Sequence, residues 1–148
     1  MKIYLDVCCL NRPFDDQSQD RIRFESEAIL TILGYHGNKN WILIGSEVID
    51  IEISKIPDPD RQQKVQFLSS MRLSQIIVDE KVEERAVQLE QLGFQSFDAL
   101  HIACAEKGKA DVLLTTDSRL IAKAIQNREI LKVRLENPTR WLTEVIEK

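Results

Sequence analysis

The sequence has few of the residues that mark disulfide-rich, zinc-binding or membrane proteins. Only three of its 148 residues are cysteine, and no two of them have a Cys-x-x-Cys spacing. Neither a disulfide framework nor a zinc site is therefore expected, and free thiols fit a reducing cytoplasm. No apolar run approaches the roughly 20 residues that a membrane span needs, and the first residues form a strand pattern instead of a signal peptide. We expect a cytoplasmic protein with no membrane partner.

An excess of basic residues is also lacking. The chain has 20 Lys and Arg against 24 Asp and Glu, a net charge of −4, which argues against a protein that coats nucleic acid non-specifically. Local contacts to phosphate groups remain open, and the surplus acid can be concentrated where a metal ion neutralises it. Because 148 residues with 43% hydrophobic composition suffice for one core, we expect a single domain over residues 1–148.

Short β-prone runs alternate with helical patterns along the chain. The runs cover residues 3–7, 41–44, 75–78, 112–116 and 130–135. The helical patterns cover residues 20–35, 47–56, 60–72, 81–92, 96–107 and 117–126, and a last one opens at Asn137. Residues 11–16 contain Pro13 and are expected to form a loop. This alternation predicts a parallel sheet that is covered by helices on both faces.

Four carboxylates stand at informative positions in this pattern. Asp6 and Asp117 follow the first and fourth expected strands, and the crevice of a parallel sheet lies beyond such strand ends. Asp98 is in the first turn of a helix that is apolar almost all the way round and is therefore expected to be buried. Glu52 lies within the isoleucine arc of its helix, where an unpaired carboxylate costs several kcal/mol. Glu52 should thus have a partner or a ligand.

Each of these acids alone has a structural explanation, as a turn residue, a helix N-cap or a partner of the helix dipole. Together they are harder to explain, because two like charges 4 Å apart repel by about 4 kcal/mol at an effective dielectric constant of 20. Protons or divalent cations can neutralise such a cluster. Oxygen ligands without a Cys/His set favour Mg²⁺ or Mn²⁺ over zinc. The residues therefore indicate metal-dependent phosphodiester hydrolysis with water as the nucleophile.

Four motifs that span nearly the whole chain carry a resemblance to a known family: Ile3-Tyr4-Leu5-Asp6, Ser46 to Glu52, Phe97 to Ala103 and Leu114-Thr115-Thr116-Asp117. They resemble the motifs of PIN-domain ribonucleases, and in particular VapC-like toxins of toxin–antitoxin pairs. The resemblance implies a three-layer α/β/α sandwich with a central, mostly parallel sheet of four or five strands. It implies RNA as substrate, a small antitoxin and a second copy of the chain as partners, and one or two Mg²⁺ or Mn²⁺ ions. The implied metal ligands are Asp6, Glu52, Asp98 and Asp117, with Thr116 as an accessory hydroxyl.

The chain departs from this family after the first acid. Members usually have a small hydroxyl residue and then Asn or Ser there, whereas this chain has Val7 and Cys8. Asn11 arrives later and is a possible accessory residue that orients water. The departure leaves open a catalytically silent PIN-like module that binds RNA or a partner protein. A phosphotransfer enzyme with Asp6 as nucleophile fits poorly, because Cys8 stands where a second acid is needed.

Further polar residues have two interpretations each. Glu25 is an inward acid that is either a fifth metal ligand or, as we favour, the ion-pair partner of Arg21 or Arg23. His101 lies three residues after Asp98, and we expect it to be a hydrogen-bonded histidine of the core and not a catalytic one. Candidates for contacts with RNA phosphates are the arginines close in sequence to the acids, Arg12, Arg21, Arg23 and Arg119.

Overall fold

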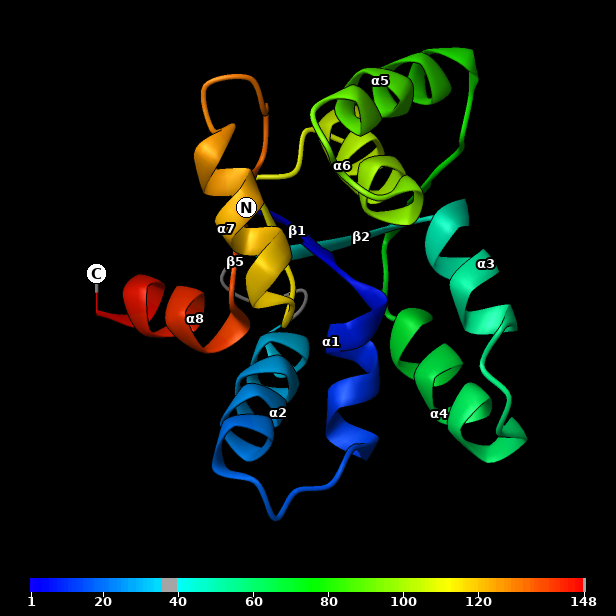
Figure 1. Ribbon diagram of the computed structural model, residues 1–148. Coiled ribbons are helices and arrows are strands. Elements are labelled where there is room, and N and C mark those ends of the chain that lie inside the picture. Colours follow the sequence, from blue (N-terminus) through cyan, green and yellow to red (C-terminus); the bar gives the residue numbers. More distant parts are fainter. Residues whose placement is uncertain (36–39, 148) are drawn as a thin grey trace.

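The computed structural model describes residues 1–35 and 40–147 of the chain (Figure 1). These residues form a five-stranded sheet in which every pair of neighbouring strands is parallel, in the order β3-β2-β1-β4-β5. The strands are β1 (Lys2–Leu5), β2 (Ile42–Ser46), β3 (Ser74–Ile76), β4 (Val112–Leu114) and β5 (Arg134–Glu136). The predicted parallel α/β fold is therefore confirmed. Residues 36–39 and 148 of the expected single domain lie outside the described residues.

Helices cover both faces of the sheet. Within the described ranges they are α1 (Val7–Asn11), α2 (Asp20–Gly34), α3 (Glu47–Ser54), α4 (Pro59–Ser69), α5 (Glu80–Gln91), α6 (Ser96–Lys107), α7 (Ser118–Gln126) and α8 (Pro138–Ile146), with a 3-10 turn at Arg12–Phe14. Figure 1 shows α5 and α6 on the opposite side of the sheet from α1 and α2. Across the sheet, the chain first passes from β1 through β2 to β3 at one edge. It then returns to β4, on the other side of β1, and continues to β5 at the opposite edge. Right-handed crossovers in opposite directions place their helices on opposite faces.

The reversal of direction makes the gap between β1 and β4 the topological switch point of the sheet. These two strands are paired in register, with Leu5 beside Leu114, and they are central, so that Tyr4 and Leu113 have no solvent exposure. In sheets of this kind the ligand crevice lies at the carboxyl ends of the strands at the switch point. The residues that follow Leu5 and Leu114 therefore occupy the functional position of the fold.

The segment after β1 differs from its prediction. The expected strand over residues 3–7 ends at Leu5, and the helix α1 starts at Val7. The Asp6 side chain caps this helix by accepting the Val7 N–H at 2.7 Å, which satisfies a donor that the helix itself leaves free. The predicted loop at residues 11–16 is partly a 3-10 turn, in which Pro13 stands early, where no backbone donor is needed.

The last strand also differs, since the predicted run at residues 130–135 is shorter and later in the structure. The amides of Ile130 and Leu131 donate to the carbonyl of Asn127 at 2.9 and 3.1 Å. These residues therefore belong to the turn that closes α7, and pairing with β4 starts only at Arg134. In the part of the chain with described positions, no helix is long and apolar enough to cross a membrane.

Candidate metal centre

Asp6 is held rigidly at the switch point. Its backbone N–H donates to the carbonyl of Leu114 at 3.0 Å, which continues the pairing of β1 with β4 by one residue. One carboxylate oxygen caps α1, and the other accepts the hydroxyl of Thr115 at 3.0 Å. Because the side chain is only 11% exposed, these two contacts fix its direction. The fold thus presents one carboxylate in one orientation at the end of the central strands.

Glu52 reaches the same place from α3 through a chain of hydrogen bonds. Nε2 of His101, on α6, bonds to Glu52 Oε1, while Nδ1 lies 2.6 Å from the hydroxyl of Tyr4. The Tyr4 hydroxyl also lies 2.7 Å from Oγ of Ser46, the residue that caps α3. Burial raises the pKa of Tyr4 well above its ordinary value, so its hydroxyl keeps its proton. Both nitrogens of His101 are therefore occupied, and its ring orients Glu52.

Asp6, Glu52 and His101 form a compact group of possible metal ligands. One donor atom from each lies within 4.8 Å of the others, and His101 Nε2 lies 3.7 Å from Asp6 Oδ1. Burial lowers the pKa of His101, but the hydrogen bond with Glu52 and the negative charges of Asp6 and Asp98 outweigh it, so the pKa lies above its usual value. The carboxylates of this group suit Mg²⁺ or Mn²⁺, while both nitrogens of His101 are held in hydrogen bonds.

The other two predicted acids lie next to this group. Burial, together with the negative charges of Asp6 and Asp117, raises the pKa of Asp98 to about 6. The four acids therefore share one electrostatic site, although Asp98 and Asp117 are not in the compact group. Asp117 is exposed and caps α7, accepting the amides of Arg119 and Leu120 at 3.0 and 3.2 Å.

A threonine that was not singled out from the sequence, Thr115, also contacts the site. Thr115 has no solvent exposure, donates to Asp6, and accepts the amide of Asp117 at 3.2 Å. It thereby ties two of the predicted metal ligands together. Thr116, the predicted accessory hydroxyl, contributes backbone contacts, since its N–H donates to Cys8 Sγ and its carbonyl accepts Arg21. Its hydroxyl stays a predicted member of the site.

Glu25 is neutralised by cations instead of joining the compact group. It is 2% exposed and accepts Arg12 Nε at 2.8 Å, Arg21 Nε at 3.1 Å and the Asn137 amide at 2.6 Å. The favoured prediction of an ion pair with Arg21 is therefore confirmed. Arg23 pairs with Asp20 instead, and the stronger contact with Arg12 was not foreseen.

The remaining predicted accessory residues are engaged in the surrounding structure. The Asn11 amide donates to the carbonyl of Val7 at 3.1 Å and accepts Arg61 at 3.2 Å, so it fixes the end of α1. Arg12 pairs with Asp15 at 3.2 Å as well as with Glu25. Arg119 is exposed at the start of α7, and its side chain has no ion-pair partner among the residues at described positions.

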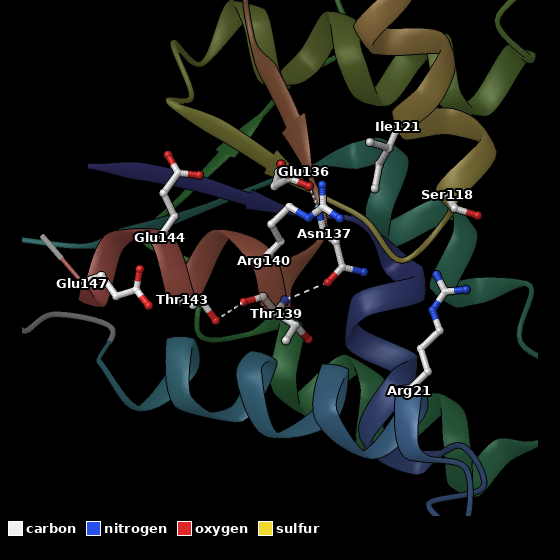
Figure 2. A pocket seen from close by; sticks show the side chains of 10 residues that line it. All are labelled: Arg21, Ser118, Ile121, Glu136, Asn137, Thr139, Arg140, Thr143, Glu144 and Glu147. Atoms are coloured by element: carbon white, nitrogen blue, oxygen red, sulfur yellow. Dashed lines mark hydrogen bonds between the residues drawn. The ribbon is translucent and has the colours of Figure 1, made fainter.

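A cavity of about 720 Å³ lies between α7 and α8. Figure 2 shows Ser118 and Ile121 of α7 on one side, Arg140 and Thr143 of α8 on another, and Arg21 of α2 beside them. The cavity is connected to the metal centre through the chain, since Ser118 follows Asp117. Sequence patterns gave no sign of it, because its walls come from α2, α7, α8 and the end of β5.

Comparisons with known proteins agree with this geometry. The family model of the PIN domain matches residues 3–126. A chain of VapBC2 from Rickettsia felis, solved with a promoter DNA fragment, is similar with a TM-score of 0.58 and 21% identity over 93% of this chain and 98% of that one. A chain of VapBC-1 from Haemophilus influenzae is similar with a TM-score of 0.58 and 13% identity over 94% of this chain and 99% of that one. A chain of a toxin–antitoxin complex from Klebsiella pneumoniae is similar with a TM-score of 0.57 and 18% identity over 92% of this chain and 97% of that one. No curated protein sequence gave a match.

Proposed function

This chain belongs to the PIN domain family, and from that premise we propose that it is a metal-dependent ribonuclease. One observation carries the proposal. Among the residues that the structure describes, no lysine or arginine pairs with Asp6, Glu52, Asp98 or Asp117. These acids share a site at the switch point of the sheet, where the charge repulsion would be relieved by divalent cations. An ion-pair cluster of purely structural purpose would contain its own cations.

The proposed ligands are Asp6, Glu52, Asp98 and Asp117, which would hold one or two Mg²⁺ or Mn²⁺ ions. A bound ion of this kind supplies a water of lowered pKa and stabilises charge on the transferring phosphoryl group. The residues of the chain do the positioning. Val7 and Thr115 fix Asp6, and His101 fixes Glu52, so that a phosphodiester would meet carboxylates that need no reorganisation.

We further propose that the chain is the toxin of a toxin–antitoxin pair. The similar folds of chains from VapBC complexes of two bacteria and from a toxin–antitoxin complex of a third support this. RNA would be the substrate, a small antitoxin the partner, and a homodimer the assembly. The protein would act in the cytoplasm, where its three cysteines, which are free in the structure, stay reduced.

The ribonuclease proposal is tested with purified protein by calorimetric titration of Mn²⁺ and by cleavage of a fluorescently labelled RNA. We expect heat of binding and cleavage from the wild type, and loss of both in Asp98→Asn. The matched control is Asp60→Asn, the same chemical change at an exposed residue of α4, which should behave as the wild type. Binding and cleavage that survive Asp98→Asn unchanged would overturn the metal centre. RNA binding without cleavage by the Mn²⁺-loaded wild type would instead favour a catalytically silent module.

The toxin proposal needs a separate test, because a ribonuclease need not be a toxin. Expression of the chain without a partner should slow the growth of a bacterial host, and Asp6→Ala should restore growth at an equal protein level. Abundant wild-type protein in a normally growing culture would contradict the toxin role while leaving the ribonuclease proposal intact.

A further inference from the structure

We propose that Cys8 is a positioning residue of the metal centre. Its thiol completes a chain of hydrogen bonds that fixes two of the proposed ligands, Asp6 and Asp117, relative to each other. This inference rests on the metal centre of the proposed function, which gives the two acids their role. It assigns a task to one of the two residues, Val7 and Cys8, at which the chain departs from the usual motif after the first acid.

The thiol of Cys8 contacts both residues that follow β4. Its Sγ lies 3.3 Å from the hydroxyl oxygen of Thr115 and accepts the N–H of Thr116 at 3.3 Å. Cys8 belongs to the first turn of α1, and Thr115 lies 107 positions later in the chain. The thiol therefore joins α1, which follows Asp6, to the segment that leads into Asp117.

The direction of each hydrogen bond in this group is determined by its partners. A hydroxyl has one proton and two acceptor lone pairs, whereas an ionised carboxylate can only accept. Thr115 gives its proton to the Asp6 carboxylate at 3.0 Å. One lone pair of the same hydroxyl accepts the N–H of Asp117 at 3.2 Å. Cys8 must therefore donate its S–H to the second lone pair of Thr115.

The result is a continuous chain of hydrogen bonds from the Thr116 amide through the Cys8 thiol and the hydroxyl next to it to the Asp6 carboxylate. Groups that donate and accept at once polarise one another, which strengthens each bond of such a chain. Thr115 has no solvent exposure and Thr116 is 7% exposed, so water is not at hand to replace a lost partner. Removal of the thiol leaves a lone pair of Thr115 and the amide of Thr116 without the partner that each has in the structure.

Asp6 is the end of the chain that would meet a metal ion. A carboxylate has about four lone-pair positions, and the Val7 N–H and the Thr115 hydroxyl take one on each oxygen. The remaining positions face the direction that these two donors leave open. Loss of a group that orients a metal ligand typically lowers metal affinity or activity about 10–100-fold. Because a thiol is a weak donor and acts through Thr115, we expect an effect at the lower end of this range.

The first test is calorimetric titration of Mn²⁺ into three variants of the full chain. Cys8→Ala should bind Mn²⁺ about tenfold more weakly than the wild type, because alanine neither donates nor accepts. Cys8→Ser should stay within about threefold of the wild type, since a hydroxyl does both. The matched control is Cys9→Ala, the same change at the next residue. Cys9 has no solvent exposure and donates to the carbonyl of Leu114 at 3.2 Å, so its loss should leave the Mn²⁺ affinity nearly unchanged.

A double-mutant cycle separates positioning from general packing. If Cys8 acts through Thr115, Cys8→Ala should cost little further Mn²⁺ affinity in a Thr115→Val background. Equal losses in the two backgrounds would overturn the proposal. A Cys8→Ala protein that binds Mn²⁺ as the wild type does, or a Cys9→Ala protein that loses as much affinity, would overturn it as well.

A second measurement needs neither metal nor RNA, and it decides the case in which Thr115→Val does not fold. In the metal-free protein, hydrogen exchange at the Thr116 amide, followed by NMR, should be several-fold faster in Cys8→Ala and close to the wild type in Cys8→Ser. Unchanged exchange in Cys8→Ala would overturn the proposal. Mn²⁺ binding that depends on Cys8 in a protein that cleaves no RNA would support the positioning role and remove only the ribonuclease function. A wild type that binds no Mn²⁺ removes both.

Discussion

Two groups of buried acid lie on either side of residues 115–117, and they differ in what neutralises them. Glu25 accepts hydrogen bonds from two arginines and an asparagine. Asp6 and Glu52 share a single basic partner among the described residues, the imidazole of His101. The two groups are connected, because Arg21 bonds both to Glu25 and to the Thr116 carbonyl. The difference teaches that burial of an acid does not identify a ligand site. A surplus of acids over cations does, since four carboxylates surround the single imidazole of His101 and the rest of the charge must be balanced from outside the chain.

The largest expected effect comes from removing a carboxylate that has no cation. Asp6→Asn should reduce RNA cleavage at saturating Mn²⁺ by about a thousandfold, since the loss of one electrostatic contact to a developing charge typically costs about 10²–10³ in rate. The variant also weakens Mn²⁺ binding, which calorimetry detects. Single-turnover cleavage at several Mn²⁺ concentrations gives the rate. A rate within a factor of a few of wild type would remove Asp6 from the metal centre.

Glu25→Gln should reduce the stability of the fold and leave Mn²⁺ binding unchanged, in contrast to Asp6→Asn. The variant leaves Arg12 and Arg21 without their shared carboxylate, and breaking a buried ion pair costs about 3–5 kcal/mol. Because both arginines are partly exposed, we expect a smaller loss in the free energy of unfolding, about 2 kcal/mol. Urea denaturation measures it. The Mn²⁺ affinity should be unchanged, and a parallel loss of Mn²⁺ binding would show that Glu25 is a fifth ligand.

Asp98→Asn should stabilise the metal-free protein at neutral pH. The pKa of Asp98 is raised to about 6 in the fold, so the folded protein binds this proton more tightly than the unfolded chain does. Stability from Asp98 is therefore present at low pH and is lost as pH rises through about 6. After allowance for solvent screening at this partly buried site, we expect a gain of about 1 kcal/mol.

Thermal melts with a chelator at pH 7.5 and pH 4.5 check this prediction. The variant should melt above the wild type at the higher pH, and the two should converge at the lower pH. An equal difference at both pH values would mean that the change acts through packing instead of charge. Added Mn²⁺ should reverse the order at pH 7.5, because it stabilises the wild type alone.

Tyr4→Phe should have the smallest effect. It removes the hydroxyl that contacts His101 Nδ1 and Ser46, at a cost of about 1 kcal/mol in the free energy of unfolding. Glu52 would keep its bond to His101 but with a less constrained ring, so cleavage should fall only a few-fold. Two-dimensional NMR of the histidine ring follows the change directly. An unaltered His101 signal would show that Tyr4 does not orient the ring.

Much of the fold follows from patterns within single segments. The apolar runs at β1 and β4 and the helical periodicity between them predict a parallel sheet, since a few neighbouring residues carry each signal. The segment after Leu5 was missed because α1 is only five residues long and begins with Asp6 as its cap. Ile130 was assigned to a strand because alternation also occurs in a turn. In both places the hydrogen bonds of the folded chain decide, and periodicity does not record them.

In the candidate site too, some residues can be predicted from the sequence and others only from the folded structure. Asp6, Glu52, Asp98 and Asp117 stand out because an acid in an apolar segment or at a strand end is unusual in the sequence itself. Thr115 has no such mark, and the position of His101 in an apolar helix predicted a hydrogen-bonded core histidine without indicating Glu52 as its partner. Thr115 matters because β4 pairs with β1 and brings its hydroxyl to Asp6.

The sequence by itself determined the parallel α/β architecture and the acids at its strand ends, because periodicity and unusual burial of charge are local properties. The tertiary structure decided which acids have cations. Arg12 reaches Glu25, and no arginine or lysine at a described position reaches Asp6 or Asp98. It also decided that a cavity lies between α7 and α8. Pairing and enclosure depend on distances between segments far apart in the chain, which no run of neighbouring residues contains.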